Sequence, residues 1–382
     1  MKIQLKAPLI VVSITLMTAG LSAYSSYSAN VRMIEAAKQR ELRTTATVIQ
    51  TSIAEQTSKA SARAALVTAL PSIKDAFRHQ DRAELARRLV PAFLEQREKF
   101  GVREGHFHLA PAISFLRLFD LEAGHGEDLS GFREMVLATN RHQEPQKGVE
   151  IGRRGLSIRG VYPVEDAAGP MGSFEVGMSF STVLEDTKRT TGFDAGVFVD
   201  DSIMERVATS MPRPAADHVI GGFQAVESTD WAVLKTMATP DLLTKVNDVT
   251  TRLPTVGGVE YGMVLVPVLD FKGSGIGSVV ATKSFAGFQS QARQALVTAI
   301  GFAFLQAALL AGALILVLNG MLIRPLALIN TKISKLTKGE KGQSLASISA
   351  AQDEIGQMAR HLDALEGSMS GQDGRRETGA NV

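Results

Sequence analysis

Hydrophobic and polar positions divide the chain into two long uncharged runs and a mixed region between them. Residues 7–31 and 294–323 carry no charged side chain. Each run is longer than the roughly 20 residues that an α-helix needs to cross the hydrocarbon core of a bilayer. We therefore predict membrane-spanning helices over residues 7–29 and 294–323. A buried helix of a soluble domain is a poor alternative, because these uncharged runs are too long for one.

The first run has a second interpretation, a secretory signal peptide that is cleaved after Leu21-Ser22-Ala23. The run is long for the apolar part of a signal peptide, and the helical pattern continues beyond the cleavage position. Both features favour a retained membrane span.

Basic residues beside the two runs predict the orientation. Lys2 and Lys6 precede the first run, and Arg324 and four lysines follow the second. Basic residues mark the cytoplasmic side of a membrane protein, so residues 1–6 and the segment after residue 323 are expected in the cytoplasm. Residues 30–293 are then expected outside, held to a bacterial inner membrane by two passes.

The region between the runs is predicted to contain a long helix and two mixed units. Apolar positions from residue 30 to 70 recur at helical spacing, and Pro71 ends this stalk helix. Two further helices are expected at 73–78 and 83–100, and one at 129–140. Strand-like runs bounded by Gly and Pro follow Gly101, at 105–109, 115–120, 156–163, 172–180, 194–199, 231–236, 259–267 and 277–284. We expect an α+β fold with two successive units, about 70–185 and about 186–290.

Composition narrows the functional classes. The 382 residues are 45% hydrophobic and 21% charged, with a net charge of +2 and no cysteine. Nucleic-acid binding is not expected without a basic field, and thiolate metal sites and cysteine nucleophiles are excluded. Gly273-x-Gly275-x-Gly277 precedes a strand rather than a helix, so we interpret it as a turn and not a nucleotide site. No catalytic residue, metal or cofactor is predicted, and the chain is not expected to be an enzyme.

Four sequence blocks in the first unit resemble a known family. Residues 107–117, F-H-L-A-P-A-I-S-F-L-R, are similar to the F-H-L-P-P-A-x-S-F-L-R stretch of double Cache sensor domains, and 126–133, 148–161 and 172–177 match the following blocks in order. The resemblance implies two tandem PAS-like antiparallel sheets on a long N-terminal helix, with a small-molecule pocket in the first unit. Ala110 departs from the usual proline, which implies a less rigid loop at the pocket.

The candidate ligand-binding residues of this unit suit a small anionic or amino-acid-like ligand, because guanidinium groups hold carboxylates in a bidentate manner. They are Arg117, Arg153, Arg159, Glu175 and His108, with Arg154 nearby. The alternative is that the strand arginines and glutamates form cross-strand pairs on a solvated face.

The histidines and phenylalanines of this unit receive structural interpretations. His106, His108, His125 and His142 match no compact metal-site spacing. Phe107, Phe115 and Phe119 are interpreted as core residues rather than an aromatic cage.

The segment after the second run predicts a pair of short amphipathic helices. Pro325 stands at the entry, and Asp353-Glu354-x-Gly356 opens the second helix. The segment 324–369 resembles a HAMP signal-relay domain, in which these four residues belong to the relay motif. Each helix has one apolar stripe, so we expect a second copy to bury it in a homodimeric four-helix bundle. The alternative is a helix pair on the membrane surface. Residues 370–382 are expected to be disordered.

Two functions follow from these features. The first is a transmembrane small-molecule sensor without its own output domain, since no kinase, cyclase or long coiled coil follows, so that a cytoplasmic partner would read the signal through the HAMP pair. The second is a membrane-organising scaffold that resembles the magnetosome-associated MamY family and would lie in a magnetosome membrane. For this role Lys332, Lys335 and Lys338 are candidate contacts for anionic lipids.

Overall fold

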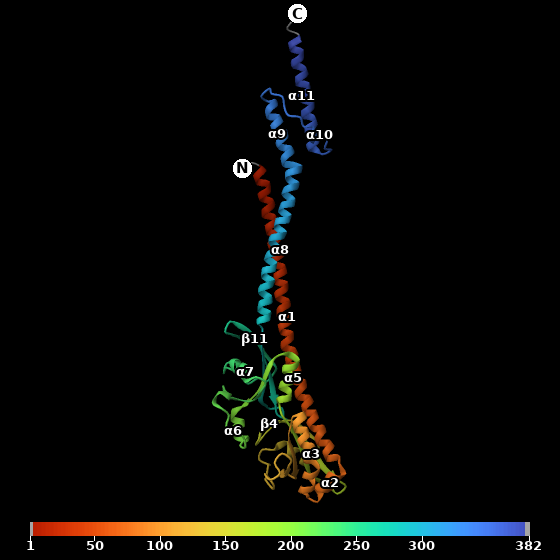
Figure 1. The fold of residues 1–382 in the computed structure, drawn as a ribbon, viewed down its shortest axis with the longest axis vertical. Helices are drawn as coiled ribbons and strands as arrows, with labels where there is room; N and C mark the ends of the chain where they lie inside the picture. The colour runs from red at the N-terminus through yellow and green to blue at the C-terminus, as the bar shows by residue number, and fades with distance from the viewer. Residues whose placement is uncertain (1–2, 379–382) are drawn as a thin grey trace. The chain divides into compact units, whose positions relative to one another are not determined.

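The computed structural model describes the backbone of residues 3–378 and the side chains of residues 6–368. It divides into two compact units. The larger unit comprises residues 33–290, and the smaller one comprises residues 3–32 together with 291–378. Figure 1 shows the course of the chain through both.

Three successive helices begin the chain, and the sequence explains their boundaries. Pro71 is the first residue of the second helix, where its missing N–H removes no helical hydrogen bond. Asp81 caps the third helix by accepting a hydrogen bond from the Glu84 N–H at 2.9 Å, and Gly101 ends it with a φ of 69°. The predicted stalk helix and the two helices after it are confirmed. They are α1 (Ile3–Ala69), α2 (Pro71–Arg78) and α3 (Arg82–Phe100).

A five-stranded antiparallel sheet follows, which together with α2 and α3 we call the first lobe (residues 70–178). The strand order is β2-β1-β5-β4-β3, so β5 lies in the centre. A single helix, α4 (Glu134–His142), connects β2 to β3. The strands are β1 (Val102–Leu109), β2 (Ile113–Arg117), β3 (Gln146–Gly152), β4 (Gly155–Asp166) and β5 (Gly169–Met178).

The two faces of this sheet differ in chemistry because side chains alternate along each strand. Phe107 and Phe174 point to the helices, where their rings lie 4.4 Å apart and Phe77 of α2 packs 5.2 Å from Phe107. Phe115 belongs to the same aromatic core. The predicted core role of Phe107 and Phe115 is confirmed. On the opposite face the same strands carry charged and polar side chains that are nonetheless buried.

The second lobe (residues 181–284) contains a larger antiparallel sheet in the order β10-β11-β12-β6-β8-β7, with β9 paired to β11. Its strands are β6 (Asp194–Asp200), β7 (Val219–Ile220), β8 (Phe223–Ser228), β9 (Thr250–Arg252), β10 (Thr255–Val256), β11 (Val259–Leu269) and β12 (Gly275–Ser284). Its helices are α5 (Ser181–Thr191), α6 (Asp201–Val207) and α7 (Trp231–Met237), with a 3₁₀ turn η1 (Ala216–His218). The expected α+β fold with two antiparallel sheets on a long N-terminal helix is thereby confirmed.

The strand predicted at 231–236 is wrong, because this segment forms α7. Asp230 caps the helix by accepting a hydrogen bond from the Val233 N–H at 3.2 Å, and Leu234 and Met237 are buried on one side. Their spacing of three residues suits a helix, and the cap satisfies an N–H that a helix leaves free.

Helix α1 also packs on the second lobe. Leu42 and Ile49 are fully buried in the same hydrophobic core as the lobe's strands. Lys38 donates a hydrogen bond to Glu260 of β11 at 2.5 Å, and Lys283 donates to Glu41 at 3.2 Å. One helix therefore packs on both sheets of the larger unit.

The smaller unit contains the N-terminal part of α1 and the helices α8 (Ala286–Leu318), η2 (Asn319–Ile323, a π-helical turn), α9 (Arg324–Leu336), α10 (Ala346–Ser349) and α11 (Glu354–Thr378). Two helical stretches, Lys6–Ala69 and Ala286–Leu336, contain segments long and apolar enough to cross a membrane by length and composition. Helices α9 to α11 share an apolar cluster that includes Ile329, Ile348 and Ala359.

Two expectations for this unit need correction. Lys332 does not lie on an exposed basic stripe with Lys335 and Lys338, because its side chain is only 1% exposed and its ammonium group pairs with Asp363 and, at 2.8 Å, with Glu366. Residues 370–378, expected to be disordered, continue α11, since extending a helix already nucleated costs little. Residues 379–382 lie outside the described residues.

We predict that Gly160→Ala destabilises the larger unit, because a Cβ atom at Gly160 would lie 2.3 Å from the backbone nitrogen of Ser61 in α1. Such overpacking costs about 1–3 kcal/mol. Urea denaturation of the full chain in detergent micelles measures the free energy of unfolding. Gly131→Ala is the matched control, because a Cβ atom there meets nothing within 4 Å. Equal stability of the two variants would contradict the close approach of β4 to α1.

Candidate ligand-binding site in the first lobe

Five charged side chains form a buried cluster on the polar face of the first-lobe sheet, which we call the ionic cluster. Its members are Glu104, Arg133, Glu150, Arg159 and Glu175, and each is less than 10% exposed. Arg159 donates to Glu104 at 2.6 Å and also bonds Glu175. Arg133 donates to Glu150 at 2.9 Å and bonds the other oxygen of Glu175. Glu175 thus links the two arginines.

The sheet topology brings these residues together from distant parts of the chain. Glu175 lies on the central strand β5, opposite His106 of β1 and Val161 of β4. Arg159 projects from β4, and Glu150 from its neighbour β3. Arg133 precedes α4, whose first turn is held to the cluster by the hydrogen bond from the Met135 N–H to Glu150 at 3.0 Å. The loop before α4 is therefore fixed over the sheet by charge pairing.

Charge pairing offsets the effect of burial on the pKa of Glu175 and of Arg159. Burial alone would raise the pKa of Glu175, but Arg133 and Arg159 lower it to about 2. Burial lowers the pKa of Arg159, and the opposing effect of Glu104, Glu175 and Glu150 is larger, so that its pKa is raised. Three carboxylates against two guanidinium groups give the cluster a formal charge of −1.

Two histidines lie beside this cluster and are held neutral. The rings of His106 and His108 are 4.0 Å apart, and His106 Nε2 lies 2.8 Å from the Ser114 hydroxyl. Neither ring nitrogen of His108 has a hydrogen-bond partner in the described part of the chain, and its Nε2 lies 3.8 Å from Glu175. Burial lowers the pKa of His108 to about 3 in spite of Glu175, and burial is also the largest cause that lowers the pKa of His106.

A cavity of about 190 Å³ opens beside the cluster and is lined by arginines. At its mouth Arg117 donates to Glu127 at 2.6 Å, and Arg153 pairs with the other oxygen of the same carboxylate. Arg154 lies over the ring of Phe119 at 4.8 Å. The mouth therefore has three arginines for the two carboxylates of Glu127 and Asp120, a formal surplus of one positive charge. This arrangement can bind a small anion.

The predicted ligand residues fall into two groups. Arg117 and Arg153 lie at the cavity mouth and are partly exposed, whereas Arg159, Glu175 and His108 are buried in or beside the ionic cluster. The alternative prediction is that the strand arginines and glutamates pair across strands on a solvated face. Arg159 and Glu175 do pair across strands, but the face of the sheet that carries them is buried.

Sequence reasoning missed Glu104, Glu150 and Arg133 as members of the site. Alternation along β1 would have placed Glu104 on the same face as His106 and His108. Arg133 ends the second resemblance block, but the block itself gives no sign that its guanidinium reaches β5. Only the folded loop before α4 shows this contact.

Comparison with known proteins identifies the family. The family described as the double sensory domain of two-component sensor kinases matches residues 35–302, and the chain belongs to this family. No curated protein matches the chain.

Several solved structures are similar to this chain at low sequence identity. The sensor domain of the histidine kinase DctB from Vibrio cholerae is 12% identical with a TM-score of 0.37, and the match covers 67% of this chain and 97% of that one. The periplasmic domain of LuxQ from Vibrio cholerae is 9% identical, with a TM-score of 0.39 and coverage of 64% and 99%. The ligand-binding domain of the Campylobacter jejuni chemoreceptor Tlp3, solved with 4-methylisoleucine, is 9% identical, with a TM-score of 0.36 and coverage of 69% and 94%.

We predict that acid destabilises the fold below about pH 6.5, the ordinary pKa of histidine. Between about 6.5 and 3 the unfolded chain binds a proton at His108 that the folded chain does not, so stability falls as pH falls, by about 1.4 kcal/mol per unit for each such histidine. Glu175, with its pKa lowered to about 2, acts in the same direction at lower pH.

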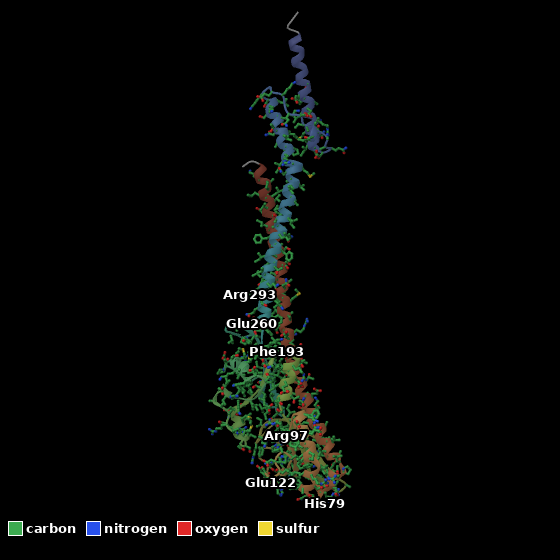
Figure 2. All side chains as sticks on the ribbon, viewed as in Figure 1. His79, Arg97, Glu122, Phe193, Glu260 and Arg293 are labelled. Atoms are coloured by element: carbon green, nitrogen blue, oxygen red, sulfur yellow. The ribbon has the colours of Figure 1, made fainter. Side chains whose placement is uncertain are left out.

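Urea denaturation of the full chain in micelles at about pH 7.5 and about pH 5.5 measures this slope, since the window begins at the histidine pKa. His108→Leu removes one of the two histidines and is expected to reduce the slope by about half. His79→Leu is the control, because His79 is exposed directly after the end of α2 (Figure 2). An unchanged slope in His108→Leu would show that His108 does not titrate as its burial requires.

Proposed function

We propose that this chain is a transmembrane sensor whose first lobe binds a small anionic or amino-acid-like molecule at the arginine-lined cavity. The observation that carries the proposal is the shared carboxylate at the cavity mouth, where Arg117 and Arg153 both pair with Glu127. Two guanidinium groups on one carboxylate leave donors free for a second one. Membership of the double sensory family supports the same role.

The chemistry of the mouth suggests how such a ligand would bind. Its carboxylate would lie between Arg117 and Arg153, in part replacing Glu127. An ammonium group on the same ligand would find carboxylates at Glu127 and Asp120, which line the same cavity. The cavity of about 190 Å³ suits a molecule of amino-acid size better than a larger one.

The ionic cluster supports the site rather than supplying its free donors. Arg159 and Glu175 already bond each other and further members of the cluster, so we assign them and His108 as positioning residues. Removing Arg159 would leave Glu104 buried without the cation that it pairs with, which costs about 3–5 kcal/mol. An Arg159 variant would therefore test folding and not ligand binding.

We further propose that the apolar helices cross a bacterial inner membrane twice, with both ends of the described chain in the cytoplasm. Residues 324–369 would act as a HAMP pair in a homodimer, read by a cytoplasmic partner. Asp353 caps α11 by accepting from the Gly356 N–H at 2.8 Å, and a Cβ atom at Gly356 would lie 2.0 Å from the Ala351 carbonyl oxygen. These contacts explain the Asp-Glu-x-Gly motif as a helix start, preceded by Pro325 at the start of α9.

In this proposal the protein acts by binding and conformational change, without catalysis or a cofactor. The membrane-organising alternative loses one of its three lysines, because Lys332 is enclosed between Asp363 and Glu366. Lys335 and Lys338 remain exposed. No contact in the described chain favours that role over sensing, so we retain the sensor.

We predict that one or more amino acids or small dicarboxylates raise the melting temperature of the full chain in nanodiscs, and that Arg153→Gln abolishes the shift. Loss of a charged hydrogen bond weakens binding by about tenfold or more. Arg141→Gln, on the exposed side of α4, is the matched control. A shift that survives in Arg153→Gln, or the absence of any shift across both ligand classes, would refute binding at this mouth.

The absence of cysteine makes the topology directly testable. Thr209→Cys lies on an exposed loop of the second lobe and Glu340→Cys on the exposed connector after α9. We expect a membrane-impermeant maleimide to label Thr209→Cys in intact spheroplasts and to label Glu340→Cys only after permeabilisation. Labelling of both, or of Glu340→Cys alone, in intact spheroplasts would overturn the two-pass orientation.

A further inference from the structure

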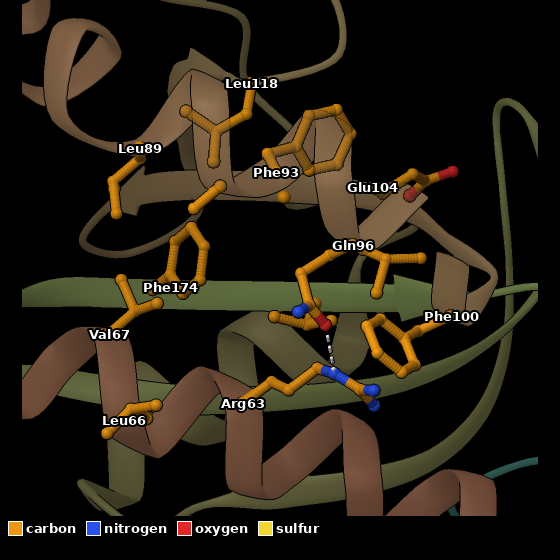
Figure 3. A pocket seen from close by; sticks show the side chains of 14 residues that line it. Arg63, Leu66, Val67, Leu89, Phe93, Gln96, Phe100, Glu104, Leu118 and Phe174 are labelled. Atoms are coloured by element: carbon orange, nitrogen blue, oxygen red, sulfur yellow. Dashed lines mark hydrogen bonds between the residues drawn. The ribbon is translucent and has the colours of Figure 1, made fainter. Parts of the chain in front are cut away.

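The first lobe contains a second cavity, on the face of the sheet opposite the ionic cluster. Its volume is about 390 Å³, and it lies between α1, α3 and the sheet (Figure 3). Volumes of about 300–1,000 Å³ are typical of small-molecule sites. This cavity is separate from the arginine-lined one, although Glu104 lines both.

The lining of this second cavity is almost entirely apolar. Phe93 of α3 and Phe174 of β5 form its inner part and are buried. Leu66 and Phe100 stand at its rim, 67% and 48% exposed. These large apolar side chains are in contact with water. An apolar molecule that covers them makes the free energy of binding more favourable by about 25 cal/mol per Å² of apolar surface buried.

Two charged side chains, Arg63 and Glu104, interrupt this lining. Arg63 of α1 reaches into the cavity, where its Nε donates to the Gln96 side-chain oxygen at 2.9 Å (Figure 3). Its guanidinium also contacts Met178 Sδ at 3.5 Å and lies 5.7 Å from the centre of the Phe100 ring. Partial burial lowers the pKa of Arg63.

Within the described side chains no carboxylate lies within 4.0 Å of the Arg63 guanidinium, unlike the arginines of the ionic cluster. The attraction between a guanidinium group and an anion is stronger when the guanidinium is partly desolvated in apolar surroundings than when it is exposed to water. The Gln96 amide oxygen accepts from Arg63, so its NH₂ group remains as a second donor in the lining of the cavity.

We propose that this second cavity binds a single-chain aliphatic carboxylate of medium length. The carboxylate would pair with Arg63 and Gln96, and the chain would extend along Phe93 and Phe174. Amino acids fit less well, because their ammonium group would be buried among side chains that are mostly apolar. Neutral alkyl chains of the same length would leave the Arg63 donors unused.

Such a ligand would touch the elements that a sensor must move. Leu66 and Val67 of α1 and Phe93 of α3 line the same cavity, so an inserted chain separates or clamps these helices. Glu104 lies between the two cavities and bonds Arg159 at 2.6 Å. A ligand in the apolar cavity would therefore affect the ionic cluster through the side chain of Glu104.

The test uses the full chain in nanodiscs and a diazirine-bearing decanoate as the probe. After irradiation, crosslinked peptides are mapped by mass spectrometry, so that probe dissolved in the lipid is distinguished by its position on the chain. We expect crosslinks on residues 63–67 and 89–100 that unlabelled decanoate removes and 1-decanol does not.

Arg63→Gln is expected to reduce this labelling about tenfold, whereas Arg87→Gln, exposed on α3 and not among the residues that line the cavity, leaves it unchanged. Ala92→Phe, at the exposed rim, fills the cavity and is expected to reduce labelling to background even if Arg63→Gln fails to fold. Equal labelling of wild type and Ala92→Phe, or crosslinks confined to 7–29 and 294–323, would overturn the proposal. Arg153→Gln, which tests the first cavity, should not alter this labelling.

Discussion

Glu175 is buried in the centre of the first lobe, and a carboxylate in that position requires cations around it. An unpaired charge there would cost several kcal/mol, so Arg159 from β4 and Arg133 from the loop before α4 must both reach β5. This requirement fixes three features together. It determines which side of the sheet is polar, it holds the loop before α4 against the sheet, and it forms one wall of the arginine-lined cavity. Packing of Phe174, the neighbouring residue on β5, fixes the other side against the helices.

The two lobes are joined at the same place where the proposed ligand would bind. The Ser210 N–H of the second lobe donates to the Arg153 carbonyl oxygen at 3.0 Å, and the Phe271 N–H donates to the Val149 oxygen at 3.1 Å. Arg103 of β1 pairs with Glu227 of β8 at 3.0 Å. Movement of Arg153 upon ligand binding would thus displace the segment of the second lobe that is hydrogen-bonded to it. The chain continues from the second lobe into α8. A shift of one packed lobe against another is a common route for such signals.

The first lobe therefore has chemically distinct cavities on the two faces of one sheet. One is rich in paired charges and suits a small polar anion, and the other is apolar with the single cation Arg63. Strand β1 separates them, and Glu104 contributes to both. Ligands bound as proposed on the two faces would therefore contact the same strand.

Periodicity and local chemistry alone determined the long helix, its end near Pro71, the two uncharged runs, and the first-lobe strands other than β3, which was missed. These depend on neighbours within a few residues, as does the capping of α11 by Asp353. Local pattern failed at Trp231–Met237, where apolar and β-branched residues masked a capped helix, and at Lys332, whose partners lie some thirty residues away on α11. In the site, the sequence provided Arg117 and Arg153, but only the tertiary structure decided that Arg159 and Glu175 are paired internally. The reason is physical. Whether an arginine is free to bind a ligand depends on which carboxylates the sheet places beside it, and the order of strands in the sheet cannot be predicted from any single segment of the sequence.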